Sequence, residues 1–326
     1  MKHISILIPN KAILGSLEGS RQILTQINHF YEGRGLAPIF KVQLVGLTHE
    51  VPLCGGAFTA HADMLISDIK KTDLIIIPAV DGDLKKAIEI NKEFFPWIID
   101  QYKNGAEVAS LCVGAFLLAA TGLLNGKQCA THWVAVNEFR EMFPEVNLVP
   151  EKIVTDEYGL YSSGGALSYM NLILHLVEKY AGLENAILAA KVFAIEIERG
   201  SQSPFIIFQG QKAHDDEPVK KAQEFIETKF REKITVEQLA YMFALSRRNL
   251  ERRFKKATNN TIIEYIQRVK IEAAKKDLET SRKNISEVMY EVGYSDTKAF
   301  RTTFKKVTGL SPIEYKNKYN KERALS

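Results

Sequence analysis

The sequence predicts an α/β domain followed by an all-α domain. Patterns typical of buried strands and amphipathic helices alternate through residues 1–200, which favours a flavodoxin-like parallel sheet sandwiched by helices. Residues 234–319 contain one helical unit twice, because Phe254-Lys255-Lys256 recurs as Phe304-Lys305-Lys306 in a matching context. This repeat predicts two helix-turn-helix units in the C-terminal domain.

The elements of the N-terminal domain follow from its apolar pattern. A strand at 3–8 precedes a helix at 16–31, and a second strand follows at 39–47. The continuous apolar run at 73–78 is typical of the centre of a sheet. The remaining predicted elements are a helix at about 84–102, a strand at 106–111, a short helix through 120, a helix ending near 180 and a helix at 183–197.

A cysteine stands at the end of one of these strands. Cys112 directly follows the strand at 106–111, and Val113-Gly114-Ala115 opens a helix of small residues. This order is the layout of a nucleophile elbow, which presents a side chain at the edge of the sheet where ligands of α/β proteins bind. We expect the helix N-terminus to favour a thiolate at Cys112.

In each helix-turn-helix unit an apolar stripe and a turn lead into a second helix. Ser246 is the expected N-cap of that helix in the first copy and Asp296 in the second. Residues 261–278 join the copies as one helix without Pro or Gly. At ~1.5 Å per residue it is roughly 27 Å long, which suits recognition helices about one DNA turn, ~34 Å, apart.

The outward faces of both second helices are basic. Residues 216–326 carry 25 Lys and Arg against 16 Asp and Glu, whereas residues 1–215 carry 18 against 23. A solvated charged face is the plain alternative, but charge this one-sided should attract phosphates. The outward positions hold Arg248, Asn249, Arg252, Lys255, Lys256, Lys298, Thr302, Lys305 and Lys306, with Arg247, Arg253, Thr297 and Arg301 on the flanks.

Residues 218–320 resemble the DNA-binding domain of the AraC/XylS transcription regulators. The resemblance rests on motifs such as Gly293-Tyr294-Ser295-Asp296 and Gly309-Leu310-Ser311-Pro312. It implies binding of double-stranded DNA in two adjacent major-groove segments. It places base-edge contacts on Arg248, Glu251, Arg252, Thr297, Lys298, Arg301 and Thr302, and Arg247, Lys255, Lys256 and Lys305 complete the candidate DNA-binding set. For any one of these residues, base recognition is about as frequent as the alternative, in which the side chain contacts a phosphate or does not contact DNA.

Residues 1–200 resemble the PfpI-type domain of the class I glutamine amidotransferase-like superfamily, as found in GlxA-like AraC regulators. The resemblance rests on 111–116, on 122–126 with Thr131-His132-Trp133, and on the turn at 162–165. Val113 stands where catalytic relatives have His, and Ser16 stands where they have an acid, with Glu18 nearby. The resemblance therefore implies a sensor and dimerisation domain without assured catalytic partners.

We accordingly predict no catalytic residue, metal site or cofactor. The candidate ligand-pocket residues are Cys112, Val113, Gly114, His132, Glu18 and Ser163. Two alternatives stay open for Cys112, a pocket or redox-sensitive thiol and an inert buried side chain. His132 is either a base near Cys112 or a structural residue.

Three unpaired cysteines, no signal peptide and no membrane-length apolar run predict a soluble cytoplasmic protein. The expected organisation is a sensor domain at 1–200, a linker at 201–217 and a DNA-binding domain at 218–326. We expect a homodimer that binds DNA and an unknown small-molecule effector, without membrane contact.

Three functions compete. The first is a sequence-specific transcriptional regulator whose α/β domain senses a small molecule or dimerises. The second is a PfpI-type cysteine hydrolase or hydratase that uses Cys112 and carries a DNA-targeting tail. The third is an architectural DNA binder without sequence preference, which the distinct outward residues of the two recognition helices disfavour.

Overall fold

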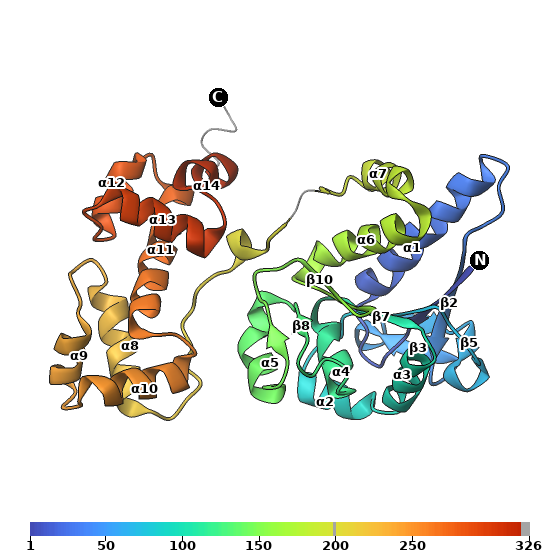
Figure 1. The fold of residues 1–326 in the computed structure, drawn as a ribbon, viewed down its shortest axis with the longest axis horizontal. Helices are drawn as coiled ribbons and strands as arrows, with labels where there is room; N and C mark the ends of the chain where they lie inside the picture. The colour runs from blue at the N-terminus through green and yellow to red at the C-terminus, as the bar shows by residue number, and fades with distance from the viewer. Residues whose placement is uncertain (198–199, 321–326) are drawn as a thin grey trace. The chain divides into compact units, whose positions relative to one another are not determined.

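The computed structural model describes residues 1–197 and 200–320. The chain divides into two compact units, Met1–Gln202 and Ser203–Ser326, and each is described by itself (Figure 1). None of the helices in the described residues is long and apolar enough to cross a membrane.

The N-terminal unit is built on a seven-stranded sheet, in the order β10-β11-β7-β6-β1-β2-β5. Neighbouring strands are parallel except β10 and β11. The strands are β1 (Lys2–Leu7), β2 (Phe40–Gly46), β5 (Met64–Leu65), β6 (Leu74–Ile77), β7 (Glu107–Ser110), β10 (Val154–Glu157) and β11 (Leu160–Ser163). All residues of β6 are buried, as a strand covered on both faces requires.

Helices cover both faces of this sheet (Figure 1). One face packs against α1 (Leu14–Glu32), α6 (Tyr169–Ala181) and α7 (Leu183–Val192). The other packs against α2 (Leu84–Ile90), α3 (Phe94–Lys103), α4 (Ala115–Ala120) and α5 (Val136–Met142). The predicted fold class, a helix-covered parallel sheet with an all-α C-terminal domain, is confirmed.

Two predicted helices differ from the structure. The helix expected at 84–102 is divided into α2 and α3, because the buried Asn91 donates its side-chain amide to Ala87 O at 2.8 Å and Asn10 O at 3.1 Å, and so competes with helical bonding. The helix expected at 183–197 ends at Val192, and Ala194 has a left-handed φ of 53°. The pattern also missed β3 (Glu50–Leu53), β4 (Phe58–His61) and β9 (Asn147–Leu148), and β8 (Gln128–Cys129) is a short strand before Thr131.

The C-terminal unit is all helical. Its helices are α8 (Glu217–Lys229), α9 (Val236–Met242), α10 (Arg247–Thr258), α11 (Ile262–Thr280), α12 (Ile285–Glu291), α13 (Thr297–Thr308) and α14 (Pro312–Tyr319). Ser246 and Asp296 cap α10 and α13 through their side chains, as predicted. The continuous helix predicted between the copies is α11, which runs between the two helix-turn-helix units (Figure 1).

Each helix-turn-helix unit has its own hydrophobic core, and α11 contributes to both. Leu250, Phe254 and Tyr265 are buried in the first core. Phe300, Phe304 and Tyr315 are buried in the second, together with the C-terminal half of α11. The two cores therefore fix both recognition helices on one connecting helix.

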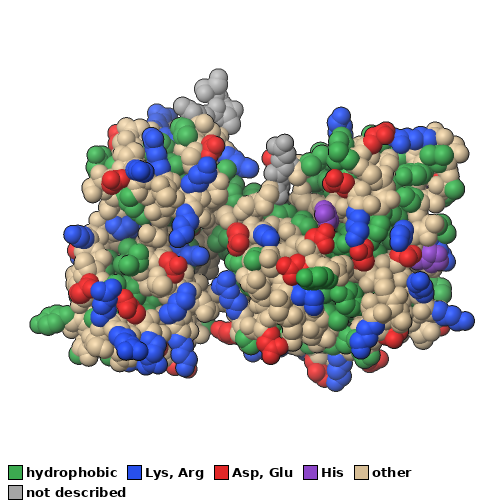
Figure 2. Space-filling view, viewed as in Figure 1, with side chains coloured by type: hydrophobic (Ala, Val, Ile, Leu, Met, Phe, Trp, Pro, Cys, Tyr) green, Lys and Arg blue, Asp and Glu red, His purple; other side chains and the backbone are tan. Residues whose placement is uncertain are grey.

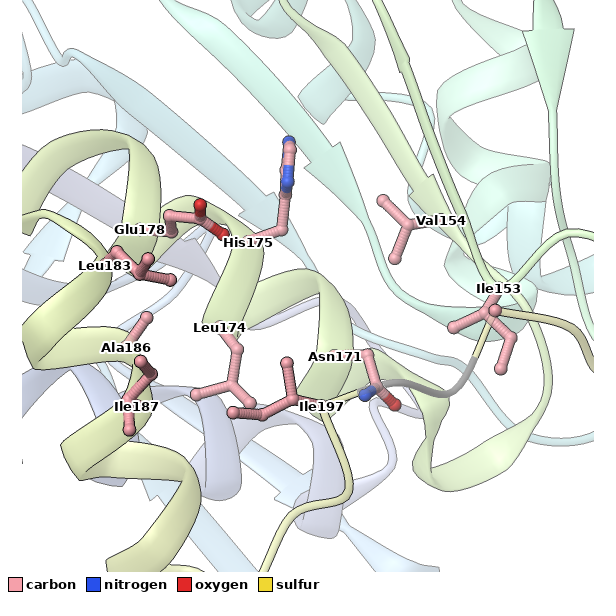
Figure 3. Close-up of a pocket in the computed structure, with 11 residues that line it drawn as sticks. Ile153, Val154, Asn171, Leu174, His175, Glu178, Leu183, Ala186, Ile187 and Ile197 are labelled. Carbon is pink, nitrogen blue, oxygen red and sulfur yellow. The ribbon is translucent and has the colours of Figure 1, made fainter.

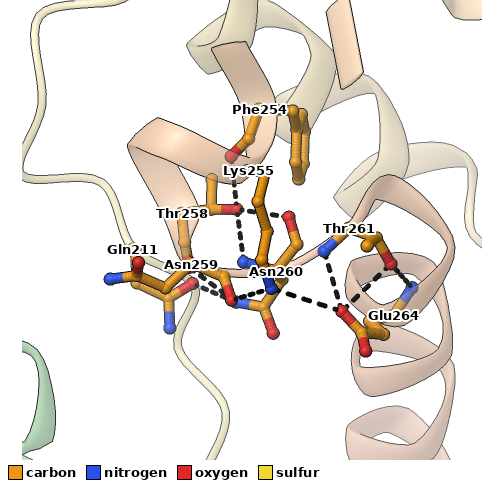
Figure 4. A network of polar contacts seen from close by, with 8 residues as sticks. All are labelled: Gln211, Phe254, Lys255, Thr258, Asn259, Asn260, Thr261 and Glu264. Carbon is orange, nitrogen blue, oxygen red and sulfur yellow. Dashed lines mark hydrogen bonds and ion pairs between the residues drawn. The ribbon is translucent and has the colours of Figure 1, made fainter. Parts of the chain in front are cut away.

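The junction between α10 and α11 is held by a polar network (Figure 4). Thr258 Oγ1 donates to Phe254 O at 2.8 Å and accepts from Asn260 N at 3.1 Å. Thr261 and Glu264 form a capping box at the start of α11. Asn260 Nδ2 also donates to Gln211 Oε1 at 3.0 Å, so a residue that precedes α8 is tied to the end of α10.

Candidate DNA interface and ligand cleft

The basic residues predicted to face DNA are exposed on α10 and α13. Lysine and arginine side chains gather over the lower part of the C-terminal unit in Figure 2, where Figure 1 draws α10. Phe254 on α10 and Phe304 on α13 are buried. The apolar side of each helix therefore faces the protein interior, and the basic side faces solvent. The exposed residues are Arg247, Arg248, Arg252, Lys255 and Lys256 on α10 and Thr297, Lys298, Arg301, Thr302 and Lys305 on α13, whereas Glu251 is half-buried.

Four of the basic residues on α10 have partners within the protein. Arg252 donates to Asn249 Oδ1 at 3.2 Å. Arg247 lies 2.6 Å from Glu237 and 3.1 Å from Glu251. Lys255 Nζ donates to Asn259 O at 2.9 Å at the end of the helix. Arg253 donates twice to Asp216, so it stabilises the fold more than it enlarges the basic face.

Other basic residues keep their charges available. Within residues 1–197 and 200–320, Arg248, Lys298 and Arg301 form no ion pair with a carboxylate. Unpaired cationic groups on an exposed helix face can bind phosphate or base edges without first breaking an internal salt bridge. Arg252, Lys256 and Lys305 are also exposed and form no ion pair with a carboxylate in the described residues, so the predicted set holds six cations of this kind.

A cleft of about 740 Å³ lies at the carboxyl ends of the central strands in the N-terminal unit. Cys112, Val113 and His132 line it, while Gly114, Ser163 and Glu18 do not. Glu18 instead pairs with Arg21 at 2.7 Å. Most of the lining is apolar, and Ser16, Asp81, Asp83, Glu138 and Tyr169 add polar groups.

Gly114 and Ser163 shape the elbow from behind the cleft. Cys112 has a left-handed φ of 54°, and its backbone N–H donates to Ser163 Oγ at 3.0 Å. A Cβ at Gly114 would lie 2.5 Å from Pro78 O and 2.7 Å from Ile77 O, so only glycine fits. These contacts hold Cys112 in a strained conformation of the kind found at functional sites.

The Cys112 thiol is protonated at neutral pH. Its side chain is buried, with 5% of the residue exposed, and burial raises its pKa to about 11, although the backbone N–H groups of Val113 and Ala166 favour the thiolate. The expectation of a thiolate at the helix N-terminus was therefore wrong, because desolvation of the charge outweighs the dipole of the short helix α4.

His132 is not arranged as a base for this thiol. Its Nδ1 accepts from Val134 N at 3.1 Å, and burial lowers its pKa below the ordinary value. The neutral ring consequently carries its proton on Nε2 and can only donate there. In this tautomer His132 can donate a hydrogen bond to an acceptor on a ligand, but it cannot abstract the proton of Cys112.

Several cleft residues were not predicted from the sequence. Asp81 and Asp83 lie in the loop after β6, and Glu138 is on α5. The only sequence signal was Asp83 before an apolar helix, and it does cap α2 by accepting from Lys86 N at 2.9 Å. Tyr169 hydroxyl donates to Gly15 O at 2.8 Å and so joins α6 to the start of α1.

A second, smaller cavity of about 310 Å³ lies beside α6, α7 and β10 (Figure 3). Leu174 and Ile187 give it an apolar wall, and His175 and Glu178 add polar groups. His175 Nε2 lies 3.2 Å from Asp156 Oδ2. Ile197 borders this cavity, and the cavity therefore lies beside the segment that leaves the N-terminal unit.

An elbow domain followed by two basic helix-turn-helix units defines a class of DNA-binding regulator. Residues 36–179 match the DJ-1/PfpI family, and residues 239–318 match a helix-turn-helix domain family. The HTH-type transcriptional regulator GbdR of Pseudomonas aeruginosa is 27% identical over 272 residues, which cover 81% of this chain and 73% of GbdR.

A second curated relative shares this architecture, and a solved structure shares the fold. The HTH-type transcriptional regulator GlxA of Rhizobium meliloti is 24% identical over 212 residues, or 64% of each protein. The fold also matches the crystal structure of an AraC family transcriptional regulator from Pseudomonas putida, with a TM-score of 0.50, 18% identity and coverage of 59% of this chain and 100% of that chain. The chain therefore combines a DJ-1/PfpI domain with an AraC-type helix-turn-helix domain and is a transcriptional regulator of this architecture.

Proposed function

We propose that this regulator binds its operator by placing α10 and α13 in two successive major-groove segments. The observation that carries the proposal is the shared helix α11, whose 19 residues span roughly 28 Å at ~1.5 Å each. That length suits recognition helices about one DNA turn apart. Arg248, Glu251, Arg252, Thr297, Lys298, Arg301 and Thr302 would contact bases, and Arg247, Lys255, Lys256 and Lys305 would contact phosphates.

The cleft beside Cys112 is the proposed effector site. Asp81, Asp83 and Glu138 line it, and no Lys or Arg is among its lining residues in the described part of the chain. Such a site favours a small molecule with an apolar body and a cationic or hydrogen-bond-donating group. His132 Nε2–H supplies one donor for an acceptor on the same molecule.

We propose that the N-terminal domain, residues 1–200, senses and dimerises without catalysing a reaction. A protonated thiol and a histidine whose Nδ1 is already occupied support this role. Residues 201–217 would connect it to the DNA-binding domain at 218–326, in a homodimer that acts in the cytoplasm.

One observation favours the second candidate, a PfpI-type hydrolase or hydratase. Cys112 has the strained elbow geometry that presents nucleophiles in α/β enzymes. This alternative requires an activated thiol, and the raised pKa of Cys112 argues against one.

Selection from fragmented genomic DNA tests the proposed function. The purified full chain is incubated at physiological salt with fragments and excess nonspecific competitor, and bound fragments are sequenced. We expect a small set of fragments to be enriched and to give a discrete shifted complex. Retention of all fragments in proportion to their length would contradict sequence-specific control and favour an architectural binder.

A further inference from the structure

Gln202, the last residue of the N-terminal unit, is buried among loops that form the cleft. It is only 1% exposed. Its side-chain Oε1 accepts from Gly165 N at 2.8 Å, and its Nε2 donates to Pro150 O at 2.7 Å and Thr131 O at 3.0 Å. The amide therefore joins three backbone segments at once.

Two of those segments carry cleft residues. Thr131 immediately precedes His132, and Gly165 immediately precedes Ala166, and both of these neighbours line the cleft. Ala166 N–H also reaches the Cys112 thiol. A shift of either loop when the cleft is filled would change the hydrogen bonds of Gln202.

The space around the Gln202 side chain is closely fitted. A Cβ at Gly164 would lie 2.7 Å from Gln202 Nε2, and one at Gly165 would lie 3.1 Å from Oε1. The absence of a side chain at Gly164 and Gly165 thus makes the space that the Gln202 amide fills. Gln202 cannot remain in place if the backbone at 164–165 moves by much, since interiors are closely packed.

The chain beyond Gln202 is anchored to the C-terminal unit almost at once. The Phe205 ring lies 6.3 Å from that of Tyr319. Lys275 Nζ donates to Ile206 O at 2.6 Å, and Phe208 N donates to Glu272 at 3.1 Å. Phe205 follows Gln202 by three positions along the chain, so the two anchored residues are close in sequence.

The same segment continues to a recognition helix. Gln211 accepts from Asn260 at the end of α10 (Figure 4), and Asp216 accepts two hydrogen bonds from Arg253 within α10. Residues 205–216 are therefore fastened along α11 and α10 rather than free. A displacement of Gln202 therefore acts within three positions of the first of these contacts, at Phe205.

We propose that Gln202 is the positioning residue that couples occupancy of the cleft to the DNA-binding unit. Filling the cleft moves the loops at 131–132 and 165–166, Gln202 follows them, and the two-residue connection passes the change to 205–216. This inference rests on the proposed effector cleft. It requires no change in α10 or α13 themselves.

The chain offers a matched control for this role. Asn171 Nδ2 donates to Glu196 O at 2.8 Å and so ties the same departing segment to α6. Asn171 borders the smaller cavity (Figure 3) and not the cleft. Loss of Asn171 loosens the segment without touching the cleft loops, which separates coupling from simple anchoring.

A covalent label supplies a defined occupant for the cleft. Leu167 lines the cleft and is 63% exposed, so Leu167→Cys in a Cys54→Ser background gives an accessible thiol for N-ethylmaleimide. Mass spectrometry confirms a single label. Hydrogen exchange of amides 203–211 and affinity for a selected operator are then measured on the full chain, with and without label.

We expect labelling to change exchange at 203–211 and operator affinity several-fold in the parent and in Asn171→Ala. In Gln202→Ala both responses should vanish, while the unlabelled variant still binds the operator. Gln202→Glu, which keeps the acceptor for Gly165 N–H but loses the two donors, should behave likewise and serves if the alanine variant does not fold. An equal response in the Gln202 variants, or no response in the parent, would overturn the coupling role. Absence of operator binding by every unlabelled protein would instead contradict the proposed function.

Discussion

Arg253 on α10 forms two hydrogen bonds of 2.8 Å with Asp216, the N-cap of α8. The first helix of the C-terminal unit is thereby fixed to its first recognition helix by a forked ion pair. The same carboxylate accepts from Val219 N at 3.2 Å, so one side chain serves a cap and a tertiary contact together.

Two substitutions separate these roles. Asp216→Asn keeps a capping side chain and loses the ion pair, whereas Asp216→Ala loses both. In urea unfolding, wild type should be the most stable protein, Asp216→Asn the next and Asp216→Ala the least stable. The free energies of unfolding of the two variants should differ by about 1 kcal/mol, because only the alanine variant loses the cap. Equal stability of all three proteins would show that the contact contributes nothing.

The stability of this contact should depend on pH. The Arg253 guanidinium lowers the pKa of Asp216 below its ordinary value. The carboxylate therefore contributes stability that is present above an unfolded pKa of about 3.9 and is lost as pH falls through the lower folded pKa. Urea midpoints measured from pH 6 to pH 2 should fall more steeply below about pH 4 in wild type than in Asp216→Asn, and parallel curves would argue against the pair.

The recognition residues give a second prediction. Arg252→Ala or Lys298→Ala should cost about 1–3 kcal/mol of binding free energy at one operator position if the residue contacts a base. A phosphate contact would weaken all sequences alike and reduce the salt slope by about one. Fluorescence anisotropy on operators with single base changes distinguishes these outcomes. Lys103→Ala, a charge removed from exposed surface of the other unit, should leave affinity nearly unchanged.

Cys112 should react slowly with iodoacetamide. With a pKa of about 11, roughly one thiol in ten thousand is ionised at pH 7, and burial slows access further. The labelling rate in a Cys54→Ser protein should rise about tenfold per pH unit between pH 7 and pH 10. A fast, pH-independent reaction near neutrality would support the hydrolase or hydratase instead.

The elbow predicts a contrast between two glycines. Gly114→Ala should destabilise the N-terminal unit by about 1–3 kcal/mol, since its Cβ would meet two backbone oxygens. A Cβ at Gly15 in helix α1 would have no atom within 4 Å. Gly15→Ala should therefore leave the stability of the N-terminal unit unchanged or raise it by up to about 1 kcal/mol. Thermal unfolding of both variants measures the difference, and similar melting temperatures would contradict the tight elbow.

Local signals in the sequence predicted much of this molecule. Ser246 and Asp296 were identifiable as caps because capping depends on residues a few positions apart. The elbow at Cys112 was predictable for the same reason. The positions of the carboxylates Asp81 and Glu138 in the cleft were not predictable, because the order of the strands and the packing of α5 bring them there. Glu18 lies close to Ser16 along the chain, yet helix α1 directs it to Arg21.

The internal partners of the basic helices were equally hidden. Arg253 and Arg247 share the outward pattern with Arg248, but Arg253 pairs with Asp216 and Arg247 pairs with Glu237 as well as with Glu251 on α10, and Asp216 and Glu237 lie outside that helix. The protonated state of Cys112 also depends on burial by distant segments, which a helix N-terminus in a sequence does not reveal.

Methylation protection of guanine N7 on a selected operator tests the central claim most directly, because N7 lies in the major groove. One bound DNA-binding unit should protect two short segments about 10 base pairs apart on one face of the duplex. Arg252→Ala should weaken protection in one segment and Lys298→Ala in the other. Protection of a single segment, or loss of both segments together in each variant, would contradict recognition by two helices held on α11.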